Sequence, residues 1–231
     1  GTYRRNTEAY ECCALVPNVL AGVEEVDLST TVMGIPIDLP LFLSPTALQR
    51  LFHHEGERAV GRAAEAFSTL FGISSLATVG IEEIAETIRT PKIFQLYYHK
   101  DKALTWSMID RCLDAGFDAL ALTVDTIVGG NRERDLWTGF TSPPKLTPSS
   151  LLSFVTHPSW TLNYLLRDPF ELSNLKDHVA EGSNISISVS DYFSTMLDQS
   201  MDWGAAAEVR RRWGKAFCLK GIMSVGDAQR A

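Results

Sequence analysis

Short apolar runs recur along the chain, and stretches with a helical spacing of apolar residues lie between them. Residues 55–67 and 102–115 have this spacing, which predicts a helix over each range. Strands that alternate with helices build a parallel sheet that is buried on both faces, so we expect an α/β fold. The expected buried strands cover residues 41–44, 71–74, 93–97, 119–125 and 216–220.

The ends of these strands carry polar or reactive side chains. Buried parallel strands fit either a doubly wound sheet or a TIM barrel, and apolar periodicity alone does not separate the two. In TIM barrels the active site is assembled at the carboxyl ends of successive strands. Polar residues at the ends of successive strands therefore favour the TIM barrel. The alternative is that these residues only cap their strands in solvated loops. These residues are Ser44, Ser74, Ser75, Gln95, Tyr97, Thr123, Asp125 and Lys220.

The composition excludes several classes of protein. The formal net charge is -7, and no run of Lys or Arg is interleaved with aromatic residues, so we expect no nucleic-acid partner. The four cysteines have no CxxC spacing and the histidines do not fall at ligand spacing around them, so we expect reduced thiols and no metal site. The sequence has neither a signal peptide nor an apolar run of membrane-spanning length, and we expect a cytoplasmic protein.

A long insert, residues 138–203, interrupts the alternation between the fourth and fifth expected strands, and it exceeds an ordinary connection. Its first part is rich in proline, whereas residues 151–155 and 160–166 are apolar and aromatic and need a surface to pack against. One interpretation is a lid that folds back over the barrel. The other is a peripheral contact with the membrane, at its inner face.

Five short motifs make the chain resemble one enzyme family. They occur in the order and at the spacing found in the FMN-dependent 2-hydroxy acid dehydrogenases and oxidases, which include L-lactate dehydrogenase, mandelate dehydrogenase and glycolate oxidase. The resemblance covers nearly the whole chain and is weakest in residues 138–203. The motifs are residues 44–47, 94–97, 122–126, 130–135 and 219–221.

This resemblance implies a (β/α)8 TIM barrel that binds FMN. The chain would be a single partial barrel over residues 1–231, supplying roughly the first five of its eight strands. The residues implied to lie against the flavin or to hydrogen-bond its edge are Pro45, Thr46, Ala47, Ser74, Gln95, Thr123 and Lys220. An ammonium group such as that of Lys220 stabilises the negative charge that reduction places on the flavin.

The resemblance also implies catalytic roles. Tyr97 would hydrogen-bond the substrate, and Arg132 would interact with the substrate or stabilise developing negative charge at the mouth of the site. Asp125 would orient the catalytic histidine and stabilise its protonated form, which makes the imidazole a better base. Lys220 completes this catalytic set.

The family's catalytic histidine lies in a Ser-Asn-His-Gly-Gly-Arg segment that this sequence does not contain. None of the histidines present stands in that motif, and the chain begins at Gly1 rather than at Met. We therefore expect a fragment that is inactive by itself and that self-associates through its open sheet edges. A non-catalytic flavin-binding module is the alternative. An FMN barrel of the isomerase type would lack the set of Tyr97, Asp125 and Arg132.

Two residues bear on the substrate. Leu76 and Gly129 stand where glycolate oxidase has bulkier residues, which leaves room for a side chain on the alpha carbon. We expect oxidation of L-lactate or a larger L-2-hydroxy acid to the 2-keto acid, with electrons passed to a quinone or another acceptor. A hydroxy acid oxidase that uses oxygen is the alternative. The complete enzyme is expected to be a homo-oligomer.

Overall fold

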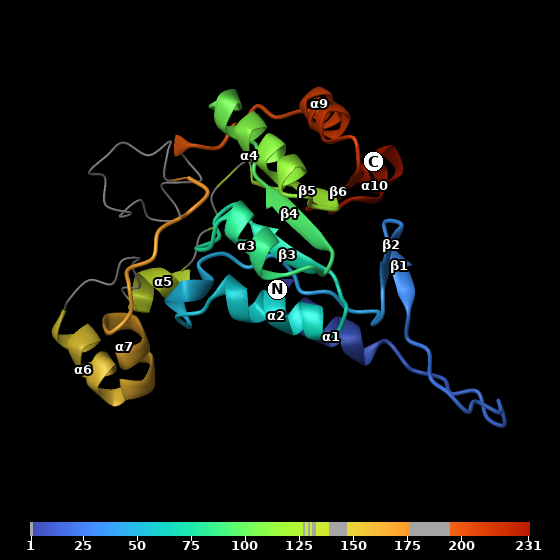
Figure 1. Ribbon diagram of the computed structural model, residues 1–231, viewed down its shortest axis with the longest axis horizontal. Helices are drawn as coiled ribbons and strands as arrows, with labels where there is room; N and C mark the ends of the chain where they lie inside the picture. Colours follow the sequence, from blue (N-terminus) through green and yellow to red (C-terminus); the bar gives the residue numbers. More distant parts are fainter. Residues whose placement is uncertain (1, 127, 129, 131–132, 139–146, 176–194) are drawn as a thin grey trace.

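The structure is a computed structural model and describes residues 2–126, 128, 130, 133–138, 147–175 and 195–231. Helices and strands alternate through most of this part of the chain (Figure 1). The helical elements are α1 (Thr2–Glu11), η1 (Gln49–Leu51), α2 (Glu57–Ala66), α3 (Ile81–Thr87), α4 (Lys102–Asp114), α5 (Glu133–Thr138), α6 (Pro148–Thr156), α7 (Pro158–Leu165), α9 (Trp203–Trp213) and α10 (Val225–Arg230). The strands are β1 (Thr30–Val32), β2 (Ile35–Ile37), β3 (Phe71–Ser74), β4 (Lys92–Leu96), β5 (Ala119–Thr123) and β6 (Ala216–Lys220).

The main sheet is parallel and has the strand order β3-β4-β5-β6. Four of the expected strands are confirmed, with shifts of one or two residues at their ends, and so are the expected helices α2 and α4. Each neighbouring pair of strands is consecutive in the chain and is joined through a helical crossover. This is the arrangement of successive βα units.

The prediction of a strand over residues 41–44 was wrong in extent. Only Leu43 pairs with the sheet, through a single parallel bridge to Phe71. The Leu43 nitrogen donates to the Leu70 carbonyl at 3.0 Å, and the Gly72 nitrogen donates to the Leu43 carbonyl at 2.8 Å. The chain passes so close that a Cβ on Gly72 would lie 2.7 Å from the Pro45 nitrogen. Glycine at residue 72 therefore lets this segment lie against β3.

Helices α4 and α9, which cover the sheet, both begin at an aspartate cap. The carboxylate of Asp101 accepts from the Ala103 nitrogen at 2.9 Å at the start of α4, and that of Asp202 accepts from the Ala205 nitrogen at 2.9 Å at the start of α9. Such caps satisfy backbone donors that have no partner within the helix. Gly214 ends α9 in a left-handed conformation with φ 70°. These caps fix where each helix crosses back to the sheet.

Helices α2, α3, α4 and α9 lie along the outer face of the sheet (Figure 1). Alternate strand residues such as Phe94, Leu96, Leu120 and Leu122 are fully buried in one cluster with side chains of these helices. Because successive side chains along a strand alternate between the two faces, Gln95 and Ala121 point to the opposite face of the sheet, here called the inner face. That inner face carries the polar strand-end residues.

A short antiparallel hairpin, β1–β2, was not predicted from the sequence. Val32 pairs with Ile35 next to its turn, and Ile37 is buried against Leu70, Ile93 and Ala119. The hairpin therefore covers part of the inner face, below the polar strand ends. It lies at the opposite end of the molecule from α6 and α7 (Figure 1).

The expectation that residues 216–220 are buried was also wrong. The side chains of Ala216 to Leu219 are only partly buried, and Lys220 is exposed. The physical reason is that β6 pairs with β5 on one side and stands at the edge of the sheet on its other side.

Candidate functional site

Four polar side chains share the inner face at the carboxyl ends of the strands. Ser74 is paired in register with Gln95, and Thr123 is paired with Lys220. Because the residues before them alternate between the two faces, their side chains point to the same side of the sheet. Ser74, Gln95 and Thr123 are almost completely buried, whereas Lys220 at the sheet edge is exposed.

The three buried residues form a continuous hydrogen-bonded row. The Ser74 hydroxyl donates to Oε1 of Gln95 at 3.0 Å, and Nε2 of Gln95 donates to Oγ1 of Thr123 at 2.7 Å. The Leu76 nitrogen donates to the Ser74 hydroxyl at 3.1 Å. Since buried polar groups are costly when left unpaired, this row holds its three side chains in fixed orientations across three strands.

Ser75 and Tyr97 lie beside this row. The Ser75 hydroxyl donates to the Gln95 carbonyl at 2.6 Å and accepts from the Tyr97 nitrogen at 3.2 Å. Tyr97 directly follows β4 and is partly buried. The structure thus brings Tyr97 to the carboxyl end of β4, beside the row, and its role in binding substrate stays a prediction.

Asp125 is placed against the end of β6. The Val124 nitrogen donates to the Lys220 carbonyl at 2.9 Å, which extends the pairing of β5 with β6 by one bond. Gly221 has φ +110°, and a Cβ there would lie 2.5 Å from Cγ of Asp125. Asp125 itself is exposed. Its carboxylate and the segment that follows Lys220 therefore meet at one edge of the site.

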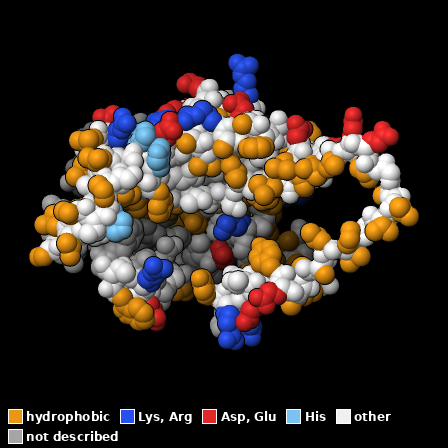
Figure 2. Space-filling model, turned by 90° about the horizontal axis from the view of Figure 1, so that it is seen from below, with side chains coloured by type: hydrophobic (Ala, Val, Ile, Leu, Met, Phe, Trp, Pro, Cys, Tyr) orange, Lys and Arg blue, Asp and Glu red, His pale blue; other side chains and the backbone are white. Residues whose placement is uncertain are grey.

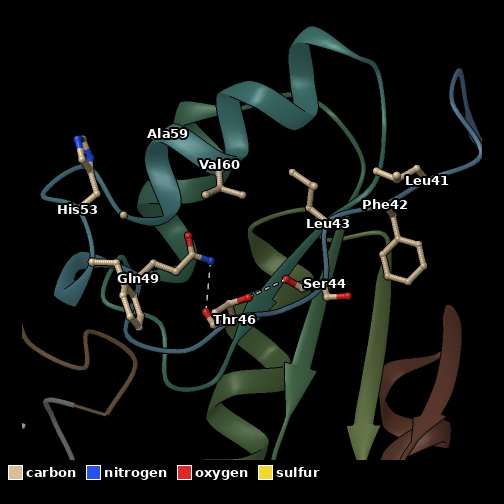
Figure 3. A pocket seen from close by; sticks show the side chains of 11 residues that line it. Leu41, Phe42, Leu43, Ser44, Thr46, Gln49, His53, Ala59 and Val60 are labelled. Carbon is tan, nitrogen blue, oxygen red and sulfur yellow. Dashed lines mark hydrogen bonds between the residues drawn. The ribbon is translucent and has the colours of Figure 1, made fainter. Parts of the chain in front are cut away.

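The segment from Ser44 to Ala47 borders a separate cavity of about 610 Å³, shown in Figure 3. Ser44, Thr46 and Gln49 are among its lining residues, together with apolar side chains from residues 41–43 and from α2. None of Ser74, Gln95, Thr123 and Lys220 lines it. This cavity is therefore distinct from the row of strand-end side chains, although it shares the segment before η1.

Gln49 is a residue that the sequence did not single out. Its Nε2 donates to the Thr46 carbonyl at 3.3 Å, while its buried Oε1 has no hydrogen-bond partner among the described residues. The contact to Thr46 ties η1 to the segment that the family resemblance places beside the flavin. Nothing in the sequence distinguishes Gln49 from an ordinary polar residue at a strand-to-helix connection.

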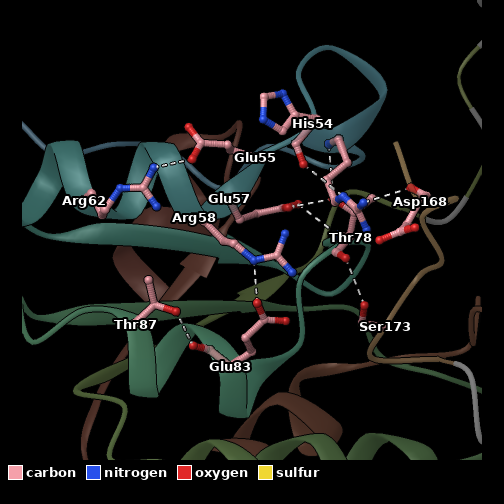
Figure 4. A network of polar contacts seen from close by, with 11 residues as sticks. His54, Glu55, Glu57, Arg58, Arg62, Thr78, Glu83, Thr87, Asp168 and Ser173 are labelled. Atoms are coloured by element: carbon pink, nitrogen blue, oxygen red, sulfur yellow. Dashed lines mark hydrogen bonds and ion pairs between the residues drawn. The ribbon is translucent and has the colours of Figure 1, made fainter. Parts of the chain in front are cut away.

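A buried carboxylate supports the loop after β3 (Figure 4). Glu57 is fully buried and accepts from the Thr78 nitrogen at 2.9 Å and from the Thr78 hydroxyl at 2.6 Å. The same hydroxyl accepts from the Arg50 nitrogen at 3.1 Å. Glu57 lies on the buried face of α2 with Gly61 and Ala64. A charged residue at helical spacing on an otherwise small or apolar face is the sequence signal that could have identified Glu57 as a buried carboxylate.

Replacing Thr78 with valine should therefore destabilise the fold, because it removes a donor from a buried carboxylate. We expect the free energy of unfolding to fall by about 1.5 to 3 kcal/mol. The matched control is Thr87→Val, since the Thr87 hydroxyl bonds to the Glu83 carbonyl on the exposed side of α3. Urea unfolding of both variants measures the difference. Equal stabilities of the two variants would contradict a supporting role for the Glu57–Thr78 pair.

Two predicted residues lie outside the described part of the chain. They are Arg132, a predicted catalytic residue, and Gly129, a predicted residue of the pocket rim. Leu76, the other residue tied to substrate size, is buried in the main cluster with 3% of its surface exposed.

Comparison with known proteins identifies the family. A family described as FMN-dependent dehydrogenase matches residues 1–231. Glycolate oxidase 1 of Zea mays is 42% identical over 230 residues, covering 100% of this chain and 56% of that protein. L-lactate oxidase of Nostoc sp. is 34% identical over 234 residues, covering 100% of this chain and 58% of that protein. The chain thus spans little more than half the length of these relatives.

A solved structure agrees with these relatives. It is described as the monotopic membrane protein (S)-mandelate dehydrogenase, and it matches with a TM-score of 0.89 at 28% identity, covering 98% of this chain and 60% of that one. The structural neighbours are TIM barrels, so the expected (β/α)8 architecture is confirmed, with this chain covering part of the barrel. The chain belongs to the FMN-dependent dehydrogenase family, whose members oxidise 2-hydroxy acids.

Proposed function

We propose that the protein of which this chain is part oxidises L-lactate or a larger L-2-hydroxy acid to the 2-keto acid with FMN. The observation that carries the proposal is the hydrogen-bonded row of Ser74, Gln95 and Thr123 on the face that also presents Lys220. Each strand of the sheet contributes a residue to this group at the same end. That convergence is typical of the active end of a TIM barrel.

The residues present fit the edge of a flavin ring. One N–H of Gln95 bonds Thr123, so its second N–H and a lone pair of Oε1 are available to a ligand. The Thr123 hydroxyl accepts in this row and can donate outward. A planar heterocycle with alternating donors and acceptors needs neutral partners of this kind. FMN, when bound, accepts the two electrons removed from the substrate.

The remaining roles divide between cofactor and substrate. The Lys220 ammonium supplies positive charge at one end of the row, where it would stabilise negative charge on the reduced ring. The Tyr97 hydroxyl and the Arg132 guanidinium would hold the substrate. Asp125 would orient the histidine that takes the substrate proton and would favour its protonated form. The backbone of Pro45, Thr46 and Ala47 would lie along the ring.

For the electron acceptor we favour a quinone reached from a peripheral membrane contact. The similarity to a monotopic membrane (S)-mandelate dehydrogenase supports this contact, and so does the apolar character of α6 and α7. Among the described residues, no helix is long and apolar enough to cross a bilayer. The protein would then be cytoplasmic, bound at the inner face of the membrane, and a homo-oligomer. The similarity to an L-lactate oxidase favours the alternative, in which oxygen is the acceptor.

The test is stopped-flow reduction of the complete FMN-loaded protein, of which this chain is part, by L-lactate, glycolate and (S)-mandelate in the absence of oxygen. We expect reduction by L-lactate or (S)-mandelate to exceed that by glycolate at least tenfold, roughly the effect of one well-placed apolar group. The reduced protein is then mixed with a short-chain quinone or with oxygen. Flavin that no 2-hydroxy acid reduces would contradict the proposal, and faster reoxidation by oxygen than by quinone would favour the oxidase.

A further inference from the structure

Helices α6 and α7 form a hairpin whose outer side is apolar. No Asp, Glu, Lys or Arg occurs between Thr147 and Leu166. Figure 2 shows hydrophobic side chains gathered at the left end of the molecule, the end that carries α6 and α7 in Figure 1. Soluble monomers rarely leave such a cluster of aliphatic side chains in water. The large hydrophobic residues exposed on this hairpin, here called the α6–α7 apolar surface, are Leu151, Leu152, Val155, Leu162, Leu165 and Leu166.

The opposite side of the hairpin is held together by aromatic rings. Trp160 stacks on Tyr164 with ring centroids 5.0 Å apart, and the Phe154 ring lies tilted to Trp160 with centroids 5.5 Å apart. Tyr164 in turn meets the edge of Phe170 at 6.3 Å. These contacts use the large aromatic side chains within the hairpin and leave the aliphatic ones outside.

Hydrogen bonds fasten the hairpin to residues 50–54, the end of η1 and the loop after it, here called the anchoring loop. The Trp160 indole donates to the Leu51 carbonyl at 2.8 Å, and Nδ1 of His54 lies 2.9 Å from Oδ1 of Asn163. Just beyond α7, the Asp168 carbonyl accepts from the Arg50 guanidinium at 3.0 Å. The α6–α7 apolar surface is therefore presented by an element that is fixed to residues 50–54, which follow the segment Ser44–Ala47 closely in the chain.

We infer that the α6–α7 apolar surface inserts into the interface of an electrically neutral bilayer. The inference rests on the proposed membrane contact and names its lipid chemistry. Anionic lipids attract proteins through clustered Lys and Arg, and residues 147–166 contain neither. The whole chain carries a formal charge of -7, which anionic lipids would repel. Burial of aliphatic side chains is then the driving force, and salt does not screen it.

The attachment also orients the site. The anchoring loop begins at Arg50, which is three residues past Ala47, and the Gln49 side chain ties η1 to Thr46. A bilayer in contact with α6 and α7 would therefore lie on the side of the protein that carries this loop. A lipid-soluble acceptor would then reach the site from that bilayer.

Flotation of the complete protein, of which this chain is part, with phosphatidylcholine vesicles tests the inference directly. The variant carries Leu152→Gln and Leu165→Gln, at two helical positions that are 66% and 65% exposed. The matched control carries Met223→Gln and Val225→Gln, which are 86% and 76% exposed on another part of the chain. Partitioning should fall at least tenfold in the variant, since each lost leucine removes apolar area from the bilayer, and should be unchanged in the control.

Vesicles that also contain phosphatidylserine, and high salt, complete the design. The inference requires that phosphatidylserine does not strengthen binding and that high salt does not abolish it. Binding only to anionic vesicles at low salt would overturn it, as would no flotation or equal loss in the control. If the variant floats normally but sediments as a smaller species, the surface joins two copies of the chain and the inference is wrong. Flotation needs no flavin, so failure of the proposed oxidation would leave this result standing.

Discussion

Replacing Lys220 with methionine in the complete FMN-loaded protein should slow flavin reduction by L-lactate at least tenfold and lower the flavin reduction potential. The substitution keeps an apolar stem of similar length and removes the only formal charge that β6 places at the polar end of the sheet. Reduction makes the ring more negative, so loss of a fixed cation destabilises the reduced state more than the oxidised state. Stopped-flow absorbance gives the rate, and equilibration with reference dyes gives the potential.

The control for this experiment lies just before the same strand. Lys215 precedes β6, is exposed, and donates from Nζ to the Phe117 carbonyl at 3.1 Å, away from the strand ends. Lys215→Met should leave both the potential and the rate unchanged. If Lys220→Met also leaves both unchanged, Lys220 has no electrostatic role at the flavin. If both variants lose activity equally, the effect is one of folding.

The regular part of the fold could be predicted because its signals are local. Strands β3, β4 and β5 are continuous runs of buried residues, and α4 has apolar residues at helical spacing after the cap Asp101. A run of residues does not reveal which neighbour it will pair with. Residues 41–44 therefore read as a full strand, although only Leu43 is bridged to Phe71.

The hairpin β1–β2 could not be predicted for a related reason. Its strands contain three residues each, below the length at which alternation can be recognised. It is stabilised by packing of Ile37 against Leu70 and Ile93, which are distant in sequence. The same limit applies to the exposure of β6, since the sequence does not show that this strand stands at an edge.

The polar row of the site was predicted better than its supports. Ser74, Gln95 and Thr123 follow from the rule that strand ends converge, and the structure joins them by hydrogen bonds. That rule says nothing about Glu57, which acts through the backbone and hydroxyl of Thr78. Such support depends on one residue in a helix meeting another in a loop, 21 positions away.

Replacing Asp125 with alanine in the complete protein should lower kcat by about a hundredfold or more while the protein retains its FMN. General acid–base catalysis contributes on this scale, and a carboxylate that holds the histidine in its orientation shares in that contribution. Asp125 is exposed and does not belong to the buried row Ser74–Gln95–Thr123. Flavin content, measured by absorbance after purification, should therefore change little. Asp114→Ala, at an exposed aspartate that ends α4, is the control and should change neither quantity.

A second variant separates the position of the carboxylate from its presence. Gly221→Ala leaves Asp125 intact but adds a methyl carbon that would lie 2.5 Å from Cγ of Asp125. Residue 221 also has a φ of +110°, which alanine rarely adopts. The carboxylate must move, so Gly221→Ala should reproduce most of the loss in kcat with FMN retained. Loss of FMN with normal turnover per bound flavin in either variant would instead place Asp125 among the residues that hold the cofactor. If Gly221→Ala retains full turnover while Asp125→Ala does not, catalysis tolerates a displaced carboxylate. The charge of Asp125 would then matter more than its orientation.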